Sequence, residues 1–507
     1  MRRALLPALC FVLLFLAPST ALSQTTATSG QQRGVTASFF GVSVDGLNVA
    51  PSWPLNIPVG TLGKTEGTEW NWIEPSNGTF DWTALDDSIA FARGAGVSSF
   101  VYTFWSTPQW ASSEPSQSCI LTAEEGVRGC AAPPSSIGDW DRFVKALVNR
   151  YAGQIKYFEI WNEANLAETW SGNVSQMVTM AEHAYADIKA LDPGAVVLAP
   201  SVSRVGVQPY STGCNPAECW LAEYLQAGGG RYADGFSFHP YACFENDTAC
   251  AQLGIGCAQG QIQACAGSPL ETEIGDTRSI MAQFGYSGKP IMSTEGGFPS
   301  DIIGQDLLGT SEQQTAYVSR WYIIQASENV TAAVWFSEFR PQNGMLGFGT
   351  SPALGEINQA YNQTYKWLVG STMDAPCSLS GAAWECAVTL SSGTPAQIVF
   401  ADVGNTTVPS SFLSNYAEYQ CLNGSEFPLN GPLNVGIEPI LLLRSGSTGT
   451  SSSSATLATT TTSAASSVAS VTSNGSSSED VIYAAAVGVA AVAIAGIILV
   501  RRSRRGP

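Results

Sequence analysis

Two glutamates in this sequence follow apolar, β-prone runs, at the place where a strand would end. Glu163 lies in "KYFEIWNEAN" and Glu295 lies in "PIMSTEGGF". Hydrolysis of a glycoside with retention needs one carboxyl group to protonate the leaving oxygen, and a second, about 5 to 5.5 Å away, to attack the anomeric carbon. Each glutamate alone can equally cap a helix or pair with an arginine. Because two glutamates lie at such strand ends, we favour the retaining hydrolysis over these structural roles.

Glu159 shares the side-chain parity of Glu163 but lies inside the same predicted strand, so we expect it to have a structural partner. The sequence offers few of the residues that metal-dependent or Schiff-base enzymes need. His183 and His239 are the only histidines, and no Cys-x-x-Cys cluster offers zinc, so we expect neither metal nor cofactor. Among the six lysines only Lys64 lies near a predicted strand end, and that strand is weak, which disfavours a Schiff-base enzyme.

The elements that must position these residues alternate between β-rich runs and helical patterns from about residue 35 to 370. Helical stripes occur, for example, in "GDWDRFVKALVNRYAG" and "SQMVTMAEHAYADIKALDPG". The expected strands are Ser38–Val44, a weak one at Val59–Leu62, Ser98–Phe104, Ile155–Trp161, Ala195–Ser201, Gly235–His239, Pro290–Thr294 and Thr331–Phe336. This alternation predicts an α/β fold, a (β/α)8 TIM barrel over 35–370 with its site at the C-terminal strand ends. An open doubly wound sheet is the alternative, but the sequence has no Gly-rich phosphate loop.

After Gly370 the pattern changes to short strands without long helices. Candidate strands are Glu385–Leu390, Ala396–Ala401, Glu418–Leu422 and Ile437–Leu443. This spacing predicts a small β-sandwich over 371–444.

The motif around Glu163 carries a family resemblance. "FEIWNEAN" resembles the acid/base motif Trp-Asn-Glu-Pro of the retaining clan A glycoside hydrolases, with Ala164 in place of the proline. The resemblance extends over most of 35–370, and family 39 or family 5 is most similar. It implies Glu163 as acid/base, Glu295 as nucleophile and Asn162 as the hydrogen-bonding partner of the sugar 2-hydroxyl. Without the proline we expect altered loop rigidity and unaltered proton transfer.

Further segments resemble the same clan. "FSFHPY" resembles its His-x-Tyr motif, which implies that Tyr241 touches the nucleophile and that His239 lines the sugar subsite. "WNWIEPSNGTFDW" (residues 70–82) resembles a segment after the second strand, in which we expect Glu74 and Asp81 to organise a turn. For rings that stack on sugars we select Trp335 and Trp105.

One departure from the clan concerns the second strand. Members commonly carry there an arginine that hydrogen-bonds the nucleophile, whereas this chain reads "GTLGKTEGTEW", with Gly63 or Lys64 in that region. Lys64 can supply the charge but not the planar fork of arginine. Whether it replaces the arginine is left open by the sequence.

The two ends of the chain predict export and a membrane tether. Residues 1–23 have the order of a signal peptide, with cleavage after Ser23; an N-terminal membrane anchor is the alternative. Residues 445–480 read as a Ser/Thr-rich stalk, 481–500 as a transmembrane helix, and 501–507 as a cytoplasmic basic tail. Removal of the tail during lipid-anchor attachment is an alternative that the terminal arginines disfavour. We therefore expect a type I single-pass protein at the cell surface.

The cysteines fit an exported chain. Twelve cysteines, of which Cys10 lies in the signal, leave eleven. We expect the pairs Cys119–Cys130, Cys214–Cys219 and Cys377–Cys386, with Cys421 left over. Connectivity among Cys243, Cys250, Cys257 and Cys265 stays open. Eight Asn-x-Ser/Thr sequons, beginning at Asn77, Asn173, Asn246, Asn329, Asn362, Asn405, Asn423 and Asn474, are compatible with glycosylation.

The net charge of the chain limits the kinds of molecule that it is expected to bind. The formal net charge is −18, with 23 Lys and Arg against 41 Asp and Glu, which disfavours nucleic acid. Together these features predict a membrane-tethered extracellular glycosidase that cleaves β-linked oligo- or polysaccharides with retention. The alternative is an inactive barrel that binds carbohydrate as a surface adhesin. Sugar and linkage specificity, endo or exo action and oligomeric state are left open by the sequence.

Overall fold

The computed structural model describes residues 33–44, 57–119, 127–203, 216–241, 270–297, 301–302, 305–306, 311–338 and 355–444. The chain divides into two units, Met1–Gly449 and Thr450–Pro507, and all described residues lie in the first. The predicted signal peptide, stalk, membrane helix and tail lie outside the described residues, as do Cys214, Cys243, Cys250, Cys257 and Cys265. Within the described ranges, no helix combines the length and apolar character needed to cross a bilayer.

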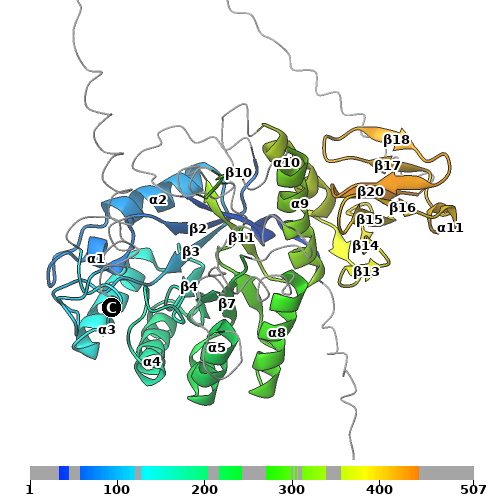
Figure 1. Ribbon diagram of the computed structural model, residues 1–507. Helices are drawn as coiled ribbons and strands as arrows, with labels where there is room; N and C mark the ends of the chain where they lie inside the picture. Colours follow the sequence, from blue (N-terminus) through cyan, green and yellow to red (C-terminus); the bar gives the residue numbers. More distant parts are fainter. Residues whose placement is uncertain are drawn as a thin grey trace, which may run out of the picture. The chain divides into compact units, whose positions relative to one another are not determined.

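A parallel β-barrel lies at the centre of the first unit (Figure 1). Its strands are β1 Phe40–Val44, β2 Thr61–Thr65, β3 Ser99–Thr103, β4 Tyr157–Glu159, β5 Val196–Leu198, β6 Val202–Ser203, β7 Phe236–His239, β8 Ile291–Ser293 and β11 Ala333–Glu338. They are ordered β5-β4-β3-β2-β1-β11-β8-β7-β6. A parallel bridge from Leu198 of β5 to Gly235, the residue before β7, closes the barrel, and β6, which follows β5 in the chain, also pairs with β7. The expected (β/α)8 barrel is confirmed.

Each of the eight expected strand runs overlaps a barrel strand. The weak second strand begins two residues later than expected, at Thr61, where it pairs with Gly41 of β1. This shift brings Lys64 into β2. Small antiparallel strands β9 Asp301–Ile302 and β10 Gln305–Asp306 pair with each other outside the barrel order.

Helices surround the barrel (Figure 1). They are α1 Trp70–Ile73, α2 Thr83–Gly94, α3 Ile137–Tyr151, α4 Val174–Leu191, α5 Pro216–Gln226, α8 Leu270–Gln283, α9 Ser311–Ser327 and α10 Gly355–Leu368, with the short 3-10 helices η1 Ala37–Phe39 and η2 Gly229–Tyr232. Both helical patterns quoted from the sequence form helices, α3 and α4. α3 buries the stripe of Trp140, Phe143, Leu147 and Tyr151. α4 starts at a capping box in which the Asn173 side chain accepts from Gln176 N.

Side chains fill the inside of the barrel. They include Val101, Leu198, Met292, Ala332 and Val334. Gly63 of β2 leaves room for this layer, since a Cβ there would lie 2.5 Å from Val334 Cγ1. The barrel is thus a packed core, and only its C-terminal end can hold a site.

Antiparallel strands follow the barrel. They are β12 Thr372–Met373, β13 Ser378–Ser380, β14 Ala383–Thr389, β15 Pro395–Ala401, β16 Thr406–Val408, β17 Glu418–Gln420, β18 Glu426–Pro428, β19 Leu433–Val435 and β20 Ile440–Leu443, with a helical turn α11 at Ser410–Leu413. β16 and β19 form one sheet and the others form a second. Val399 and Leu442 of the larger sheet share a core with Val408 and Val435 of the smaller. This is the expected sandwich, whose boundary at residue 370 stays a prediction.

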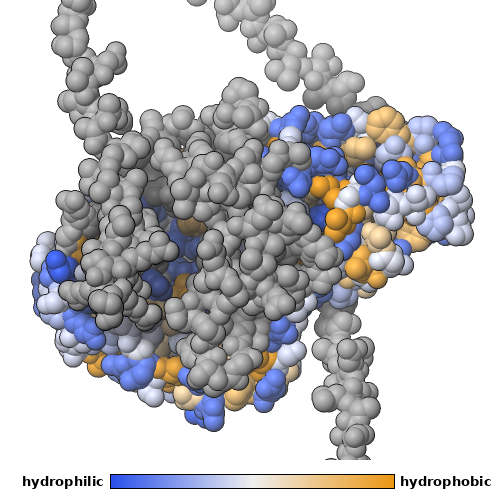
Figure 2. Space-filling model, in the orientation of Figure 1, coloured by the Kyte–Doolittle hydropathy of each residue, from blue (hydrophilic) through white to orange (hydrophobic). Residues whose placement is uncertain are grey.

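Polar and apolar residues are mixed on the surface. On the face shown in Figure 2, hydrophilic and hydrophobic residues alternate over the helices along the lower edge and over the C-terminal strands. Single apolar residues on a folded surface are ordinary.

Two of the expected disulfides are confirmed, Cys119–Cys130 and Cys377–Cys386. Cys219 is also disulfide-bonded, while its expected partner Cys214 lies outside the described residues. Cys421 has a free thiol, as expected.

Candidate active site

The two glutamates selected from the sequence lie together at the C-terminal end of the barrel. Glu163 follows β4 and Glu295 follows β8. One carboxylate oxygen of each and a ring nitrogen of His239 all lie within 4.8 Å of one another. Glu163 is 8% exposed and Glu295 is 6% exposed, so both are mostly shielded from water. The strand order brings residues that are far apart in sequence to one mouth.

A left-handed backbone conformation aims Glu163. Its φ is +47°, which is uncommon for a residue with a Cβ. Its N–H donates to Ser201 Oγ at 2.9 Å, and its carbonyl accepts from Thr169 Oγ1 at 2.6 Å. The next residue, Ala164, donates its N–H to the Ser201 carbonyl at 2.9 Å. These bonds offset the cost of the unusual φ, a pattern that is frequent at functional sites.

Glu295 is surrounded by donors. Lys64 Nζ lies 2.8 Å from its Oε2, and the Tyr241 hydroxyl donates to its Oε1. Burial alone raises the pKa of Glu295, but the charges of Lys64 and His239 and the hydrogen bonds from Lys64 and Tyr241 outweigh it. They hold that pKa well below the usual range of a carboxyl group. These contacts favour the ionised form of Glu295.

Lys64 of β2 has several contacts at the C-terminal end of the barrel. Besides Glu295, its Nζ contacts Asn162 Oδ1 at 3.2 Å, and it lies 5.4 Å from the ring centroids of both Trp105 and Phe336. The ammonium thus orients the Asn162 amide so that its Nδ2 faces away from Lys64. A lysine in β2 supplies the positive charge without the bidentate geometry of arginine.

His239, at the end of β7, connects the carboxylates. Its Nδ1 lies 2.9 Å from Glu163 Oε1 and 3.9 Å from Glu295 Oε2, and its Nε2 lies 3.8 Å from Glu159 Oε1. Burial disfavours the charged ring, but the carboxylates of Glu295, Glu159 and Glu163 raise the pKa of His239 to about 10. The expectation that His239 lines a sugar subsite stays a prediction, and the three carboxylates around the ring favour its protonated form.

The two tryptophans selected from the sequence are placed differently. Trp105 is half-buried and lies beside Lys64. Trp335 has no exposed surface, and its ring packs against Trp321 and Tyr322 of α9. Phe336, the next residue of β11, lies beside Lys64 instead. Because side chains alternate along a strand, only one of these neighbours can face the mouth, and sequence reasoning missed that it is Phe336.

The segment after β2 has the structural role expected of it. Glu74 is buried and accepts from Trp70 Nε1 at 2.9 Å, from Gly78 N at 2.8 Å and from Arg142 Nη2 at 3.2 Å. Asp81 Oδ1 accepts from Thr83 N at 3.0 Å at the start of α2.

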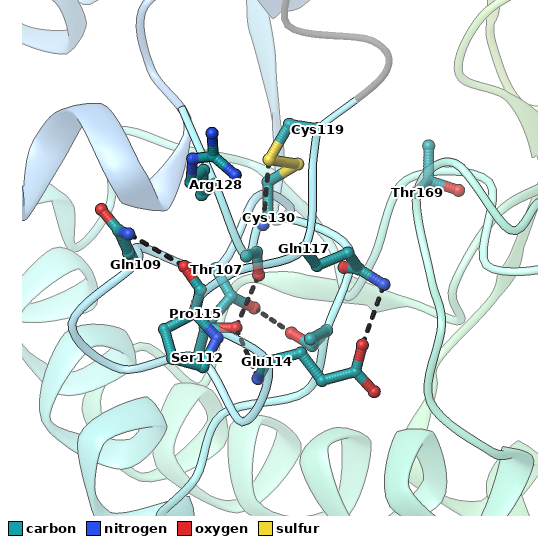
Figure 3. The surroundings of a disulfide bond; sticks show 12 residues. Thr107, Gln109, Ser112, Glu114, Pro115, Gln117, Cys119, Arg128, Cys130 and Thr169 are labelled. Carbon is teal, nitrogen blue, oxygen red and sulfur yellow. Dashed lines mark hydrogen bonds between the residues drawn. A yellow bond between two sulfur atoms is a disulfide. The ribbon is translucent and has the colours of Figure 1, made fainter. Parts of the chain in front are cut away.

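The loop between β3 and α3, which begins beside Trp105, is cross-linked (Figure 3). Cys119 and Cys130 form a disulfide, Thr107 Oγ1 donates to the Ala132 carbonyl at 2.7 Å, and Gln117 Nε2 donates to Glu114 Oε2 at 3.1 Å. These links restrain one border of the mouth.

Glu163, His239 and Glu295 are also the residue types that bind metal ions. Here Lys64 already supplies positive charge among the carboxylates, which also favour the protonated form of the His239 ring. The arrangement is that of paired carboxylates with organic cations.

Comparison with solved structures shows the fold. A family 39 glycoside hydrolase from the gut symbiont Bacteroides cellulosilyticus WH2 matches 76% of this chain and 76% of its own, with 16% identity and a TM-score of 0.54. A GH51 arabinofuranosidase from Xanthomonas axonopodis pv. citri (12% identity, 82% and 98% covered, TM-score 0.49) and a GH39 β-xylosidase from Caulobacter crescentus (14%, 82% and 98%, 0.48) also match. No family model and no curated protein matches the sequence. The chain shares the barrel fold of the family 39 glycoside hydrolase.

Proposed function

We propose that this protein is a retaining β-glycosidase with Glu163 as acid/base and Glu295 as nucleophile. The observation that carries the proposal is the pair of carboxylate oxygens within 4.8 Å of each other at the barrel mouth. Retaining enzymes hold their carboxyl groups about 5 to 5.5 Å apart, whereas inverting enzymes leave about 6.5 to 9.5 Å for a water molecule. The likeness of fold to glycoside hydrolases supports the same reaction class.

In the first step, protonated Glu163 donates its proton to the glycosidic oxygen, and Glu295 Oε attacks the anomeric carbon as the bond to the leaving group breaks. Lys64 and Tyr241 keep Glu295 ionised and oriented before the attack. Glu163, now a carboxylate, is stabilised by the Nδ1–H of His239 at 2.9 Å.

In the second step, the Glu163 carboxylate takes a proton from a water molecule, whose oxygen attacks the anomeric carbon and displaces Glu295. Two inversions restore the starting configuration. Asn162, held by Lys64, presents its Nδ2 as a donor for a sugar hydroxyl, and the rings of Trp105 and Phe336 offer apolar faces beside it.

The experiment is a substrate screen with site variants. Full-length protein is assayed on aryl β-xylosides, glucosides, mannosides, galactosides and uronides and on soluble polysaccharides. We expect turnover that falls at least about 10²–10⁴-fold in Glu163→Gln and in Glu295→Gln. Glu168→Gln, exposed on the loop after Glu163, is the matched control and is expected to stay active.

Azide distinguishes the two roles. Glu163→Ala keeps the nucleophile, so azide is expected to restore turnover of substrates with good leaving groups and to yield a β-glycosyl azide. An α-azide from this variant reverses the two assignments, and an inverted first product in NMR overturns retention. Binding on a glycan array without turnover of any substrate supports the adhesin alternative.

We also propose that the enzyme acts outside the cell on a membrane tether. The support is the signal-like order of residues 1–23 and the uncharged run Val481–Val500 followed by arginines. Protease treatment of intact cells is expected to release an active fragment ending between residues 446 and 480. Activity that stays with the membranes after this cut, or that is free in the medium without it, contradicts the tether.

A further inference from the structure

Glu159 is a buried charge that the two-step reaction does not use. It ends β4 with no exposed surface. Ser201 Oγ donates to its Oε1 at 2.9 Å, and its Oε2 has no hydrogen-bond partner. Burying a carboxylate is costly unless a cation accompanies it.

The ring of His239 is placed to be that cation. Nε2 of the ring lies 3.8 Å from Glu159 Oε1, which is an ion-pair distance, while Nδ1 lies 2.9 Å from Glu163 Oε1. A neutral imidazole carries only one N–H, so once Glu163 has given up its proton one ring nitrogen would present a lone pair to a carboxylate. An imidazolium carries an N–H on each ring nitrogen, so it faces both carboxylates with a proton. The raised pKa of His239, about 10, agrees with this geometry.

The charges at the mouth balance in one protonation state. With Glu159 and Glu295 negative and His239 and Lys64 positive, the group is neutral when Glu163 carries a proton. That is the state in which Glu163 can act as an acid. Without Glu159, the same state would leave a buried excess of positive charge.

We propose that Glu159 is a positioning residue that acts through His239: it holds the ring as an imidazolium oriented to donate to Glu163, and so maintains the proton on the catalytic pair. Ser201 adds a second connection, since its Oγ accepts from Glu163 N and donates to Glu159. The role rests on the proposed glycosidase function.

Other groups around His239 enter the same balance. The titratable or charged residues near the ring are Glu159 and Glu163 from β4 and its loop, Glu295 after β8 with its partner Lys64 of β2, and Tyr241 after β7. Glu273 of α8 lines a small cavity together with His239. Removing the negative charge of Glu159 makes proton loss from this coupled group easier, whichever residue carries the proton.

Histidine NMR tests the charge without substrate. The full-length chain has two histidines, so ¹⁵N-histidine labelling with His183→Gln as the assignment variant isolates the His239 signals. We expect imidazolium signals to persist in the wild type at pH 8, and Glu159→Gln to lose them at a pH lower by about one unit or more. Glu159→Asp keeps the charge and is expected to shift less.

A wild-type ring that is neutral at pH 8 overturns the proposal, and this result does not depend on whether any variant folds. A Glu159→Gln titration that overlays the wild type overturns it too. Ser201→Ala, which removes a hydrogen bond but no charge, is the matched control and is expected to shift less than Glu159→Gln.

The pH profile of kcat/KM supplies the catalytic readout. Glu159→Gln is expected to move the basic limb to lower pH, with partial recovery in Glu159→Asp. A uniform loss at every pH with an unmoved limb indicates a merely structural role and overturns the proposal. If the wild type turns over no glycoside, the proposed function fails, while the NMR titration still decides the state of His239.

Discussion

At the scale of single residues, the decisive contact is the one between Lys64 and Glu295. The ammonium opposes the effect of burial and lowers the pKa of Glu295, so the carboxylate persists into acid solution. Lys64→Met removes the charge, and we expect the acid limb of kcat/KM to move to higher pH by about one unit or more. Lys64→Arg keeps the charge and is the matched control. An acid limb that is the same in Lys64→Met and the wild type contradicts this account.

Glu69, just before α1, is a second buried carboxyl group, 5% exposed, whose Oε2 has no hydrogen-bond partner. Burial raises the pKa of Glu69 from 4.5 to about 7, although nearby groups, including its own backbone N–H and Lys64, oppose the shift. A carboxyl group whose pKa is higher in the folded than in the unfolded chain favours folding while it is protonated. This contribution to the free energy of unfolding is lost as the pH rises from about 4.5 through 7.

We therefore expect Glu69→Gln to gain stability relative to the wild type between pH 4.5 and pH 8, by up to about 3 kcal/mol. Denaturant unfolding at the two pH values measures the difference. Asp81→Asn, at an exposed carboxylate, is the comparison variant. A Glu69→Gln difference that is equal at both pH values contradicts the assignment.

At the scale of elements, the β4 strand and its loop hold Glu163 through backbone bonds. Ala164 donates its N–H to the buried Ser201 carbonyl, and proline has no N–H. The clan motif has proline at this position, yet here Ala164→Pro is expected to lower stability by about 1–3 kcal/mol, because the Ser201 carbonyl loses its partner. Thermal unfolding measures this, with Ala164→Gly as the variant that keeps the N–H. A proline variant as stable as the wild type would show that the loop rearranges.

At the scale of the whole molecule, Arg320 joins the barrel to the C-terminal sheets. This residue of α9 is 1% exposed, and its guanidinium donates to the carbonyls of Ile437 at 2.8 Å and Asp402 at 3.2 Å, and to that of Ala401. The Cζ of Arg320 lies 4.7 Å from the Phe400 ring centroid. A buried cation held by carbonyls of another element couples the two parts.

We expect Arg320→Met to lower stability by about 3–5 kcal/mol, since three carbonyls lose their donors together, and to separate the unfolding of the sheets from that of the barrel. Calorimetry that shows one transition in the wild type and two in the variant supports this. Arg278→Met, at an ion pair with Glu328 within the barrel helices, is the control that is expected to keep a single transition.

The sequence by itself determined the elements and the two residues that lead the proposed reaction. Side-chain period and turn residues are local, so the eight strand runs, the helices α3 and α4 and the strand-end places of Glu163 and Glu295 could be predicted. Only the tertiary structure decided the surroundings of those residues. Lys64 and Glu295 are 231 positions apart and His239 and Glu163 are 76 apart, and their contacts depend on strand order and register. The same holds for Trp335 and Phe336. The orientation of β11 places Trp335 against α9 and Phe336 beside Lys64.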